Sequence, residues 1–359
     1  MKRFITVLAV ILPLSWNAFS QEVPLEEKDL GRRLERVREL YSNDMYQAAR
    51  DGIDDILRDG FVSDAVESEL AACRIICDIR LGSPNLDALM NEYRDKYRCA
   101  PEYMGVRLLY AGYYFDRKDY ARTFEILETV EYPLLSNNDK TKYLFQRSFC
   151  QLRTGRLAEA RNGFDRLLKG RHTAYTVASV YYRGYIAYTD NDFGKAVKLL
   201  STIRHDAHFG SYCEYYILES KLMLEDYQYV ADNGASVSSR VDGDMKAKVA
   251  RMVSQAYYRL NRPEDARKWF ESYSSSGADM SRKDNYYLGI ISYSLESYNA
   301  AVDAFSKAVA CGTDDSLSQS AYLHMANSYL ELKNKHEAMT YYKKASDLKF
   351  DAGIREESF

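Results

Sequence analysis

Metal coordination is the first chemistry that residue types in this sequence suggest. His205, Asp206 and His208 lie within one short stretch. Imidazole and carboxylate groups are good ligands when their spacing lets them converge on one metal ion. A closed protein site needs about four ligands, however, and the further ligands that would complete such a set are not evident near this stretch. We therefore interpret it as a polar loop between helices, and we predict neither a metal site nor a cofactor.

The six cysteines are the second group of residues that could hold a metal ion. They are scattered along the chain at Cys73, Cys77, Cys99, Cys150, Cys213 and Cys311. Cys73 and Cys77 are four residues apart and would share one helix face, but no other ligand joins them. Because free cysteine is among the most buried residue types, we interpret these side chains as small core residues.

No catalytic motif is present. The chain contains no G-x-S-x-G, P-loop, H-E-x-x-H or Rossmann glycine pattern. Pairs of neighbouring carboxylates do occur, and acidic residues of this kind are common at helix ends and on solvated faces. These pairs are Asp54 with Asp55, Asp314 with Asp315, and Glu356 with Glu357. We predict that the protein is not an enzyme.

The charge balance excludes a main role in nucleic-acid binding. Lysine and arginine number 49 and aspartate and glutamate 52, for a net charge of -3. Binding to phosphates requires a strong basic excess. The composition is unusual in its 32 tyrosines, a residue that buries its ring while its hydroxyl stays in contact with water.

The N-terminus is typical of a secretory signal peptide. Lys2 and Arg3 precede a short apolar run at residues 4–14, and the small residues Ala18 and Ser20 follow on either side of Phe19. We predict a signal peptide at residues 1–20, with an uncleaved anchor as the alternative. No later stretch is apolar for about 20 residues, so we expect no membrane span in the mature protein. We expect export to the periplasm, or alternatively secretion or display at the cell surface.

The stretch 319–352 predicts two amphipathic helices joined by a polar turn at residues 333–335. In the first helix, apolar residues recur at i, i+3, i+4 and i+7: Tyr322, Met325, Ala326 and Tyr329. In the second, similar spacing is seen at Ala338, Tyr342 and Ala345. Small residues alternate with large ones because two helices approach closely only where Ala or Gly leaves room for a neighbouring side chain.

This pattern resembles the tetratricopeptide repeat, whose unit is about 34 residues long. Tyr322 stands where that family usually has tryptophan, and Phe350 stands where it has a closing proline. The resemblance implies an all-α fold: a right-handed α-solenoid of antiparallel helix hairpins.

The same pattern recurs along the chain every 34 to 40 residues and predicts about nine hairpins over residues 21–359. The small positions are Val37, Cys77, Ala111, Ser148, Gly184, Leu218, Ser254, Gly289 and Ala326. The sixth unit is the weakest, and we expect a flexible joint at residues 233–239. Since the chain ends before a tenth small position, we also expect the array to be truncated at its C-terminus.

The family resemblance also implies where a partner would bind, because first helices line the concave face of a tetratricopeptide superhelix. Positions three before and one, four and five after the small residue should point into the groove. The predicted binding residues are Phe149, Arg153, Tyr181, Tyr185, Tyr188, Tyr215, Arg251, Tyr258, Arg259, Tyr286 and Tyr293. Aromatic stripes at helical spacing are often core, so we expect about half of these tyrosines to pack between helices.

Two functional hypotheses follow. The first is a non-enzymatic scaffold of the bacterial cell envelope that binds a peptide or partner protein in an aromatic and basic groove. The second is a glycan- or cell-wall-binding module, or the helical part of a longer envelope enzyme, because tyrosine-lined grooves also stack on sugars.

Overall fold

The computed structural model describes residues 25–60, 62–310 and 312–358, and the regular structure of these residues is entirely helical. The prediction of an all-α protein is confirmed. The predicted signal peptide lies outside the described residues. No described helix is both long enough and apolar enough to cross a membrane.

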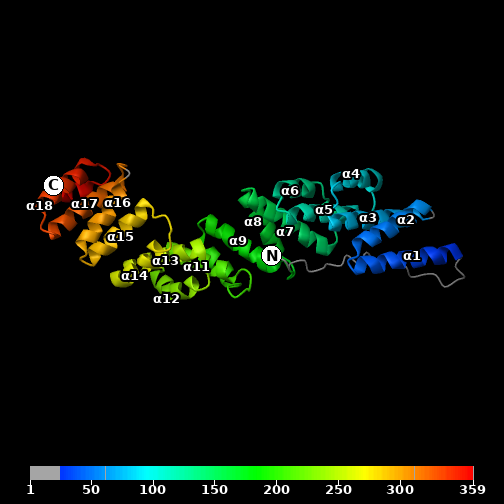
Figure 1. The fold of residues 1–359 in the computed structure, drawn as a ribbon, viewed down its shortest axis with the longest axis horizontal. Coiled ribbons are helices and arrows are strands. Elements are labelled where there is room, and N and C mark those ends of the chain that lie inside the picture. The colour runs from blue at the N-terminus through cyan, green and yellow to red at the C-terminus, as the bar shows by residue number, and fades with distance from the viewer. Residues whose placement is uncertain (1–24, 61, 311, 359) are drawn as a thin grey trace. The chain divides into compact units, whose positions relative to one another are not determined.

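The described residues divide into two compact units, one ending at residue 156 and the other beginning at residue 157 (Figure 1). In the described part of the first unit, the helices are α1 (Leu25–Ser42), α2 (Tyr46–Asp59), α3 (Asp64–Leu81), α4 (Leu86–Tyr97), α5 (Tyr103–Asp116), α6 (Tyr120–Glu128), the short 3-10 helix η1 (Tyr132–Leu134) and α7 (Asn137–Arg153). Helices α1 and α2, α3 and α4, and α5 and α6 form three successive hairpins.

The second unit begins with α8 and continues through five further hairpins to a short last helix. Its helices are α8 (Leu157–Lys169), α9 (Thr176–Thr189), α10 (Phe193–Ser201), α11 (Gly210–Met223), α12 (Tyr227–Ser238), α13 (Gly243–Arg259), α14 (Pro263–Ser274), α15 (Arg282–Ser294), α16 (Tyr298–Val309), α17 (Ser316–Glu331), α18 (Lys335–Asp347) and α19 (Ala352–Glu357). Each first helix contacts its own second helix, and that second helix contacts the next first helix.

The turns inside the hairpins share one backbone path. In the α5–α6 turn, Lys118 has a φ of 64°, and the Asp119 N–H donates to the Tyr114 carbonyl at 3.0 Å. This bond closes the end of the first helix, and the Asp119 side chain then caps the second helix by accepting from the Arg122 N–H. Positive φ recurs at the matching turn positions Asp44, Gly82, Gly155, Asn191, Glu225, Asn261, Glu296 and Lys333.

The predicted alternation of small and large residues places the helices in contact. A Cβ added to Gly184 would lie 2.6 Å from Leu200 Cδ2, and one added to Gly289 would lie 2.5 Å from Phe305 Cε1. Both large side chains are fully buried. A small residue on the first helix therefore lets the second helix of the same hairpin approach closely.

The predicted flexible joint is wrong. Residues 233–238 lie within α12, and Gly234 is buried there. A Cβ at Gly234 would come within 2.2 Å of Val253 Cγ2, so the glycine makes room for the next first helix. In this hairpin the small position carries Leu218 and the large position carries Gly234, which reverses the usual order of sizes.

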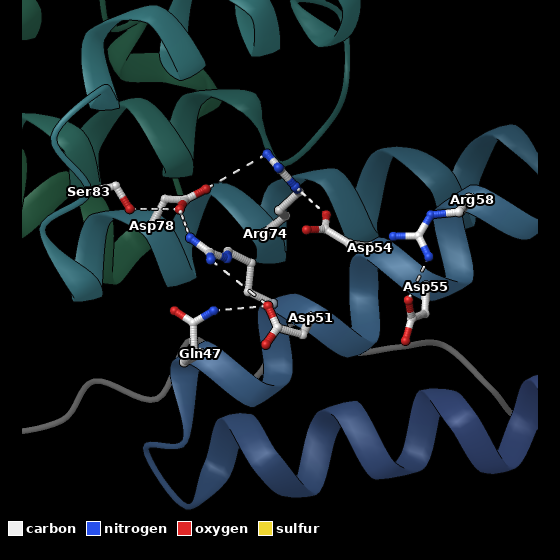
Figure 2. A network of polar contacts seen from close by, with 9 residues as sticks. Gln47, Asp51, Asp54, Asp55, Arg58, Arg74, Asp78 and Ser83 are labelled. Carbon is white, nitrogen blue, oxygen red and sulfur yellow. Dashed lines mark hydrogen bonds and ion pairs between the residues drawn. The ribbon is translucent and has the colours of Figure 1, made fainter.

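Buried polar contacts join neighbouring hairpins in the first unit. The Asp78 carboxylate of α3 pairs with Arg50 of α2, with 3.0 Å between Nη1 and Oδ1, and Figure 2 shows dashed lines from Asp78 to Ser83 and to Arg74. Asp78 also accepts from the Ser83 hydroxyl at 2.7 Å, and its second oxygen lies 3.8 Å from Arg74 Nη1. Arg74 in turn donates to Asp54 at 2.5 Å. Since Asp78 is almost fully buried, these partners compensate for the desolvation of its charge.

The C-terminal helix is held by one buried amide. Gln319 of α17 is fully buried, and its Nε2 donates to the carbonyls of Ala345, Leu348 and Asp351 at 2.9 to 3.1 Å. Its Oε1 accepts from the Asp351 N–H at 2.7 Å. Asp351 is also the N-cap of α19, so Gln319 fixes the path from α18 into α19.

Candidate interaction surface

The structure gives the histidine stretch a structural role. The Asp206 carboxylate accepts hydrogen bonds from the backbone N–H groups of His208 and Phe209, both at 2.9 Å. It thereby holds the turn that leads into α11. Among the described residues, no group of three or more His, Cys, Asp or Glu side chains is arranged to hold a metal ion.

The described cysteines are free thiols, and Cys311 lies outside the described residues. Cys77, Cys150 and Cys213 are buried, as their interpretation as core residues requires. Burial raises the pKa of the Cys213 thiol to about 12, which keeps it protonated and unreactive. Cys99 is exposed and does not fit that interpretation.

Two predicted binding residues belong to α7 in the first unit. The Phe149 ring is half-buried and lies 5.3 Å from the Phe115 ring and 5.2 Å from the Tyr120 ring. Arg153 is exposed, and its guanidinium lies 5.6 Å from the centre of the Tyr120 ring. Phe149 therefore packs between hairpins, whereas Arg153 covers an aromatic surface with its charge in water.

Three predicted tyrosines lie on α9 and contact aromatic residues from the α11 region. Tyr181 stacks on Phe209 with ring centres 4.7 Å apart. Tyr185 and Tyr188 both contact Tyr216, at 5.4 and 5.0 Å. All three α9 rings are half-buried, so each combines packing against its neighbours with a solvent-facing edge.

Tyr215 is a correction to the predicted surface. Its side chain is only 6% exposed and belongs to a core cluster with Leu218 and Val230. Burial raises the pKa of its hydroxyl, and the nearby Glu219 carboxylate raises it further. The reason is that α11 contacts α9, α10, α12 and α13. More of its circumference is therefore buried than is assumed by the offset rule, which is the prediction of groove residues from fixed positions relative to the small residue.

The residues predicted on α13 combine charge with an aromatic ring. Arg251 Nη1 lies 3.9 Å from Asp284 Oδ1, and the Arg251 side chain is 42% exposed. Tyr258 is half-buried, and burial raises the pKa of its hydroxyl. Arg259 is exposed, with its guanidinium 5.2 Å from the centre of the Tyr227 ring.

The two tyrosines predicted on α15 surround a histidine of α17. His324 stacks on Phe305 with ring centres 5.6 Å apart and an angle of 14° between the rings. Tyr286 and Tyr293 approach the same imidazole at 6.1 and 6.2 Å. Both tyrosines are half-buried, and burial lowers the pKa of His324, which favours its neutral form.

The half-buried and exposed aromatic and charged side chains at the groove positions of α9, α11, α13 and α15 form a surface that we call the first-helix face. Its members are Tyr181, Tyr185, Tyr188, Glu219, Arg251, Tyr258, Arg259, Tyr286 and Tyr293. The prediction misses Glu219, although it occupies the position directly after the small residue Leu218. It also misses Tyr216, whose position two before Leu218 lies outside the offsets used.

Residues 319–351 match the family model of the tetratricopeptide repeat. This segment, which covers most of α17 and all of α18, is a tetratricopeptide repeat. A comparison with curated proteins finds no match. Among solved structures, the C-terminal part of a tetratricopeptide repeat-containing protein from Cytophaga hutchinsonii is similar, with 14% identity, coverage of 69% of this chain and 98% of that chain, and a TM-score of 0.53. This likeness confirms the predicted α-solenoid fold.

Two further solved structures are similar at lower TM-scores. One is a tetratricopeptide repeat protein from Parabacteroides merdae, with 11% identity, coverage of 76% of this chain and 98% of that chain, and a TM-score of 0.43. The other is the apo form of the quorum sensor NprR from B. thuringiensis, with 13% identity, coverage of 79% and 99%, and a TM-score of 0.44.

Proposed function

We propose that this protein is a non-enzymatic scaffold of the bacterial cell envelope. In this proposal, the first-helix face of the second unit binds a segment of a partner protein. The observation that carries the proposal is the set of half-buried tyrosines on α9, α13 and α15: Tyr181, Tyr185, Tyr188, Tyr258, Tyr286 and Tyr293.

The residue types of this face suit a protein partner. Tyrosine brings a large, rigid contact area at a low cost in conformational entropy, and arginine pairs with carboxylates in two-point hydrogen bonds. Aromatic residues and arginine also dominate the energetics of protein interfaces. Successive first helices contact each other at α9 with α11 and at α11 with α13, so these side chains can act on one bound segment.

The envelope location rests on the N-terminal sequence. Export and cleavage before Gln21 are supported by the basic residues at positions 2 and 3, the apolar run at residues 4–14 and the small residues Ala18 and Ser20. N-terminal sequencing of the protein recovered from the periplasm, culture medium and membranes tests this part of the proposal. Recovery only from the cytoplasm with residues 1–20 intact would contradict it.

Affinity capture tests the binding proposal. Residues 21–359 are immobilised and exposed to envelope extract in one experiment and to purified peptidoglycan in another. We expect retention of a defined protein that is lost in the double variant Tyr185→Ala, Tyr258→Ala. Tyr341→Ala is the matched control, because it removes a half-buried tyrosine from the second helix α18.

Retention of peptidoglycan with no variant-sensitive protein would instead support the glycan-binding alternative. Equal protein retention by the wild type and the double variant would contradict a role for the first-helix face.

A further inference from the structure

Glu219 of α11 lies within a cluster of three tyrosines. The Tyr216 ring contacts the Tyr185 and Tyr188 rings at 5.4 and 5.0 Å, and the latter two are 6.4 Å apart. Glu219 and the three rings are all half-buried. Burial raises the pKa of Tyr188, and the charge and hydrogen bonding of Glu219 raise it further. The carboxylate is therefore close enough to act on this hydroxyl.

Glu219 differs from Glu214, the other glutamate in the middle of α11, in having no cationic partner among the described residues. Glu214, on the same helix, pairs with Arg240 at 2.7 Å and with Arg204 at 3.5 Å. Over the part of the chain that the structure describes, no arginine or lysine lies within ion-pairing distance of Glu219. A half-buried carboxylate without a cationic partner loses hydration and gains no ion pair in return.

The two arginines of the first-helix face do not supply this missing charge. Arg251 lies beside Asp284 at 3.9 Å, and Arg259 lies over the Tyr227 ring. Both belong to α13, the first helix that follows α11. The neighbours on which Glu219 acts by hydrogen bonding are instead the hydroxyls of Tyr188 and Tyr215.

Aromatic rings and a carboxylate favour the same kind of ligand. The face of a tyrosine ring carries negative electrostatic potential and attracts ammonium and guanidinium groups placed over it. A carboxylate beside the rings adds a formal negative charge and can accept charge-assisted hydrogen bonds. The combination disfavours an acidic ligand and favours a cationic one.

We propose that Tyr185, Tyr188, Tyr216 and Glu219 form a receptor for one cationic side chain, arginine or lysine, of the partner segment. The proposal rests on the proposed function, because it assigns the charge of the segment that the first-helix face binds. Charge complementarity with Glu219 selects this occupant over an acidic peptide.

A selection from random peptides tests the proposal and does not require the natural partner. A phage-displayed library of twelve-residue peptides is selected on residues 21–359, on Glu219→Gln and on Glu264→Gln. Glu264 is an exposed glutamate of α14, so its variant makes the same charge change away from the cluster. Circular dichroism melts of the three proteins establish that each is folded.

We expect wild-type and Glu264→Gln selections to be enriched in arginine and lysine, and the Glu219→Gln selection to lose that enrichment. For a selected peptide, replacing its key arginine by citrulline should weaken binding about tenfold on the wild type and much less on Glu219→Gln. Tyr216→Leu, which removes one ring, should also weaken binding of that peptide.

The possible failures are distinguishable. The cationic receptor would be overturned by enrichment of peptides without arginine or lysine, or by equal peptide affinity for the wild type and Glu219→Gln. In either case the proposed function still stands if the double variant Tyr185→Ala, Tyr258→Ala abolishes peptide binding. Absence of any enriched peptide, or binding unaffected by that double variant, would overturn both.

Discussion

Replacing Gln319 by leucine should loosen the C-terminal end of the protein. Leucine has a similar size but no amide, so the Asp351 N–H and the carbonyls of Ala345, Leu348 and Asp351 lose their partner. The amide group has two N–H donors, which the three carbonyls share. Leaving a buried backbone group unsatisfied costs about 1–3 kcal/mol, and part of this cost is recovered where α19 moves and water enters. We therefore expect a loss of about 2–4 kcal/mol in the local free energy of opening.

Hydrogen exchange measured by mass spectrometry is the suitable assay, because repeat proteins open locally and a single free energy of unfolding does not describe them well. Peptides from residues 345–358 should exchange on the order of 30- to 1,000-fold faster in Gln319→Leu, with residues 62–150 unchanged. Gln319→Glu should be at least as severe, since it places a carboxylate oxygen against three carbonyls. Gln228→Leu, at an exposed position of α12, is the control. If exchange in Gln319→Leu matches that control, the buried amide does not hold α19.

Three further predictions concern the core. Asp78→Asn should lower the stability of the first unit by about 2–3 kcal/mol in urea unfolding, because it removes the buried negative charge that pairs with Arg50. An unchanged midpoint would contradict this. Gly289→Ala should cost about 1–3 kcal/mol by forcing the Phe305 ring to move, whereas Gly105→Ala, with no atom within 4 Å, should be neutral or stabilising in the same thermal melts. Burial lowers the pKa of His324, so the imidazole takes up a proton more readily in the unfolded chain than in the folded one, and stability should fall as the pH drops below about 6.5. The variant His324→Phe should show a shallower decline in stability between pH 7 and pH 5. A decline identical to that of the wild type would refute this role.

The hairpins can be predicted from the sequence because their signals are local. Apolar residues at i, i+3, i+4 and i+7 define a helix face whatever the distant contacts are. The regular return of small and large residues then fixes which faces meet, as Gly289 and Phe305 illustrate. The sixth hairpin does not follow this rule because Leu218 and Gly234 reverse the expected order, and Gly234 makes room for Val253 of the next first helix.

The surface is harder to predict than the fold. The offset rule places Tyr185 and Tyr258 correctly at half-buried positions but fails for Tyr215, because it ignores how many neighbours each first helix has. The offset rule does not predict polar contacts between hairpins. Arg183 donates to Asp165 at 2.7 Å and Arg147 donates to Glu128 at 2.6 Å, and all four residues lie outside the offsets used.

The turn residues with positive φ affect how the sequence of such an array can vary during evolution. Seven of the described turns adopt positive φ with residues other than glycine, among them lysine, glutamate and asparagine. Each costs about 1–2 kcal/mol locally, so the helices on either side, rather than the turn, must impose this conformation. Substitution there can add, remove or invert a surface charge while the flanking helices keep their places. The turns thus offer variable positions on a constant frame, where new electrostatic preferences can arise one hairpin at a time.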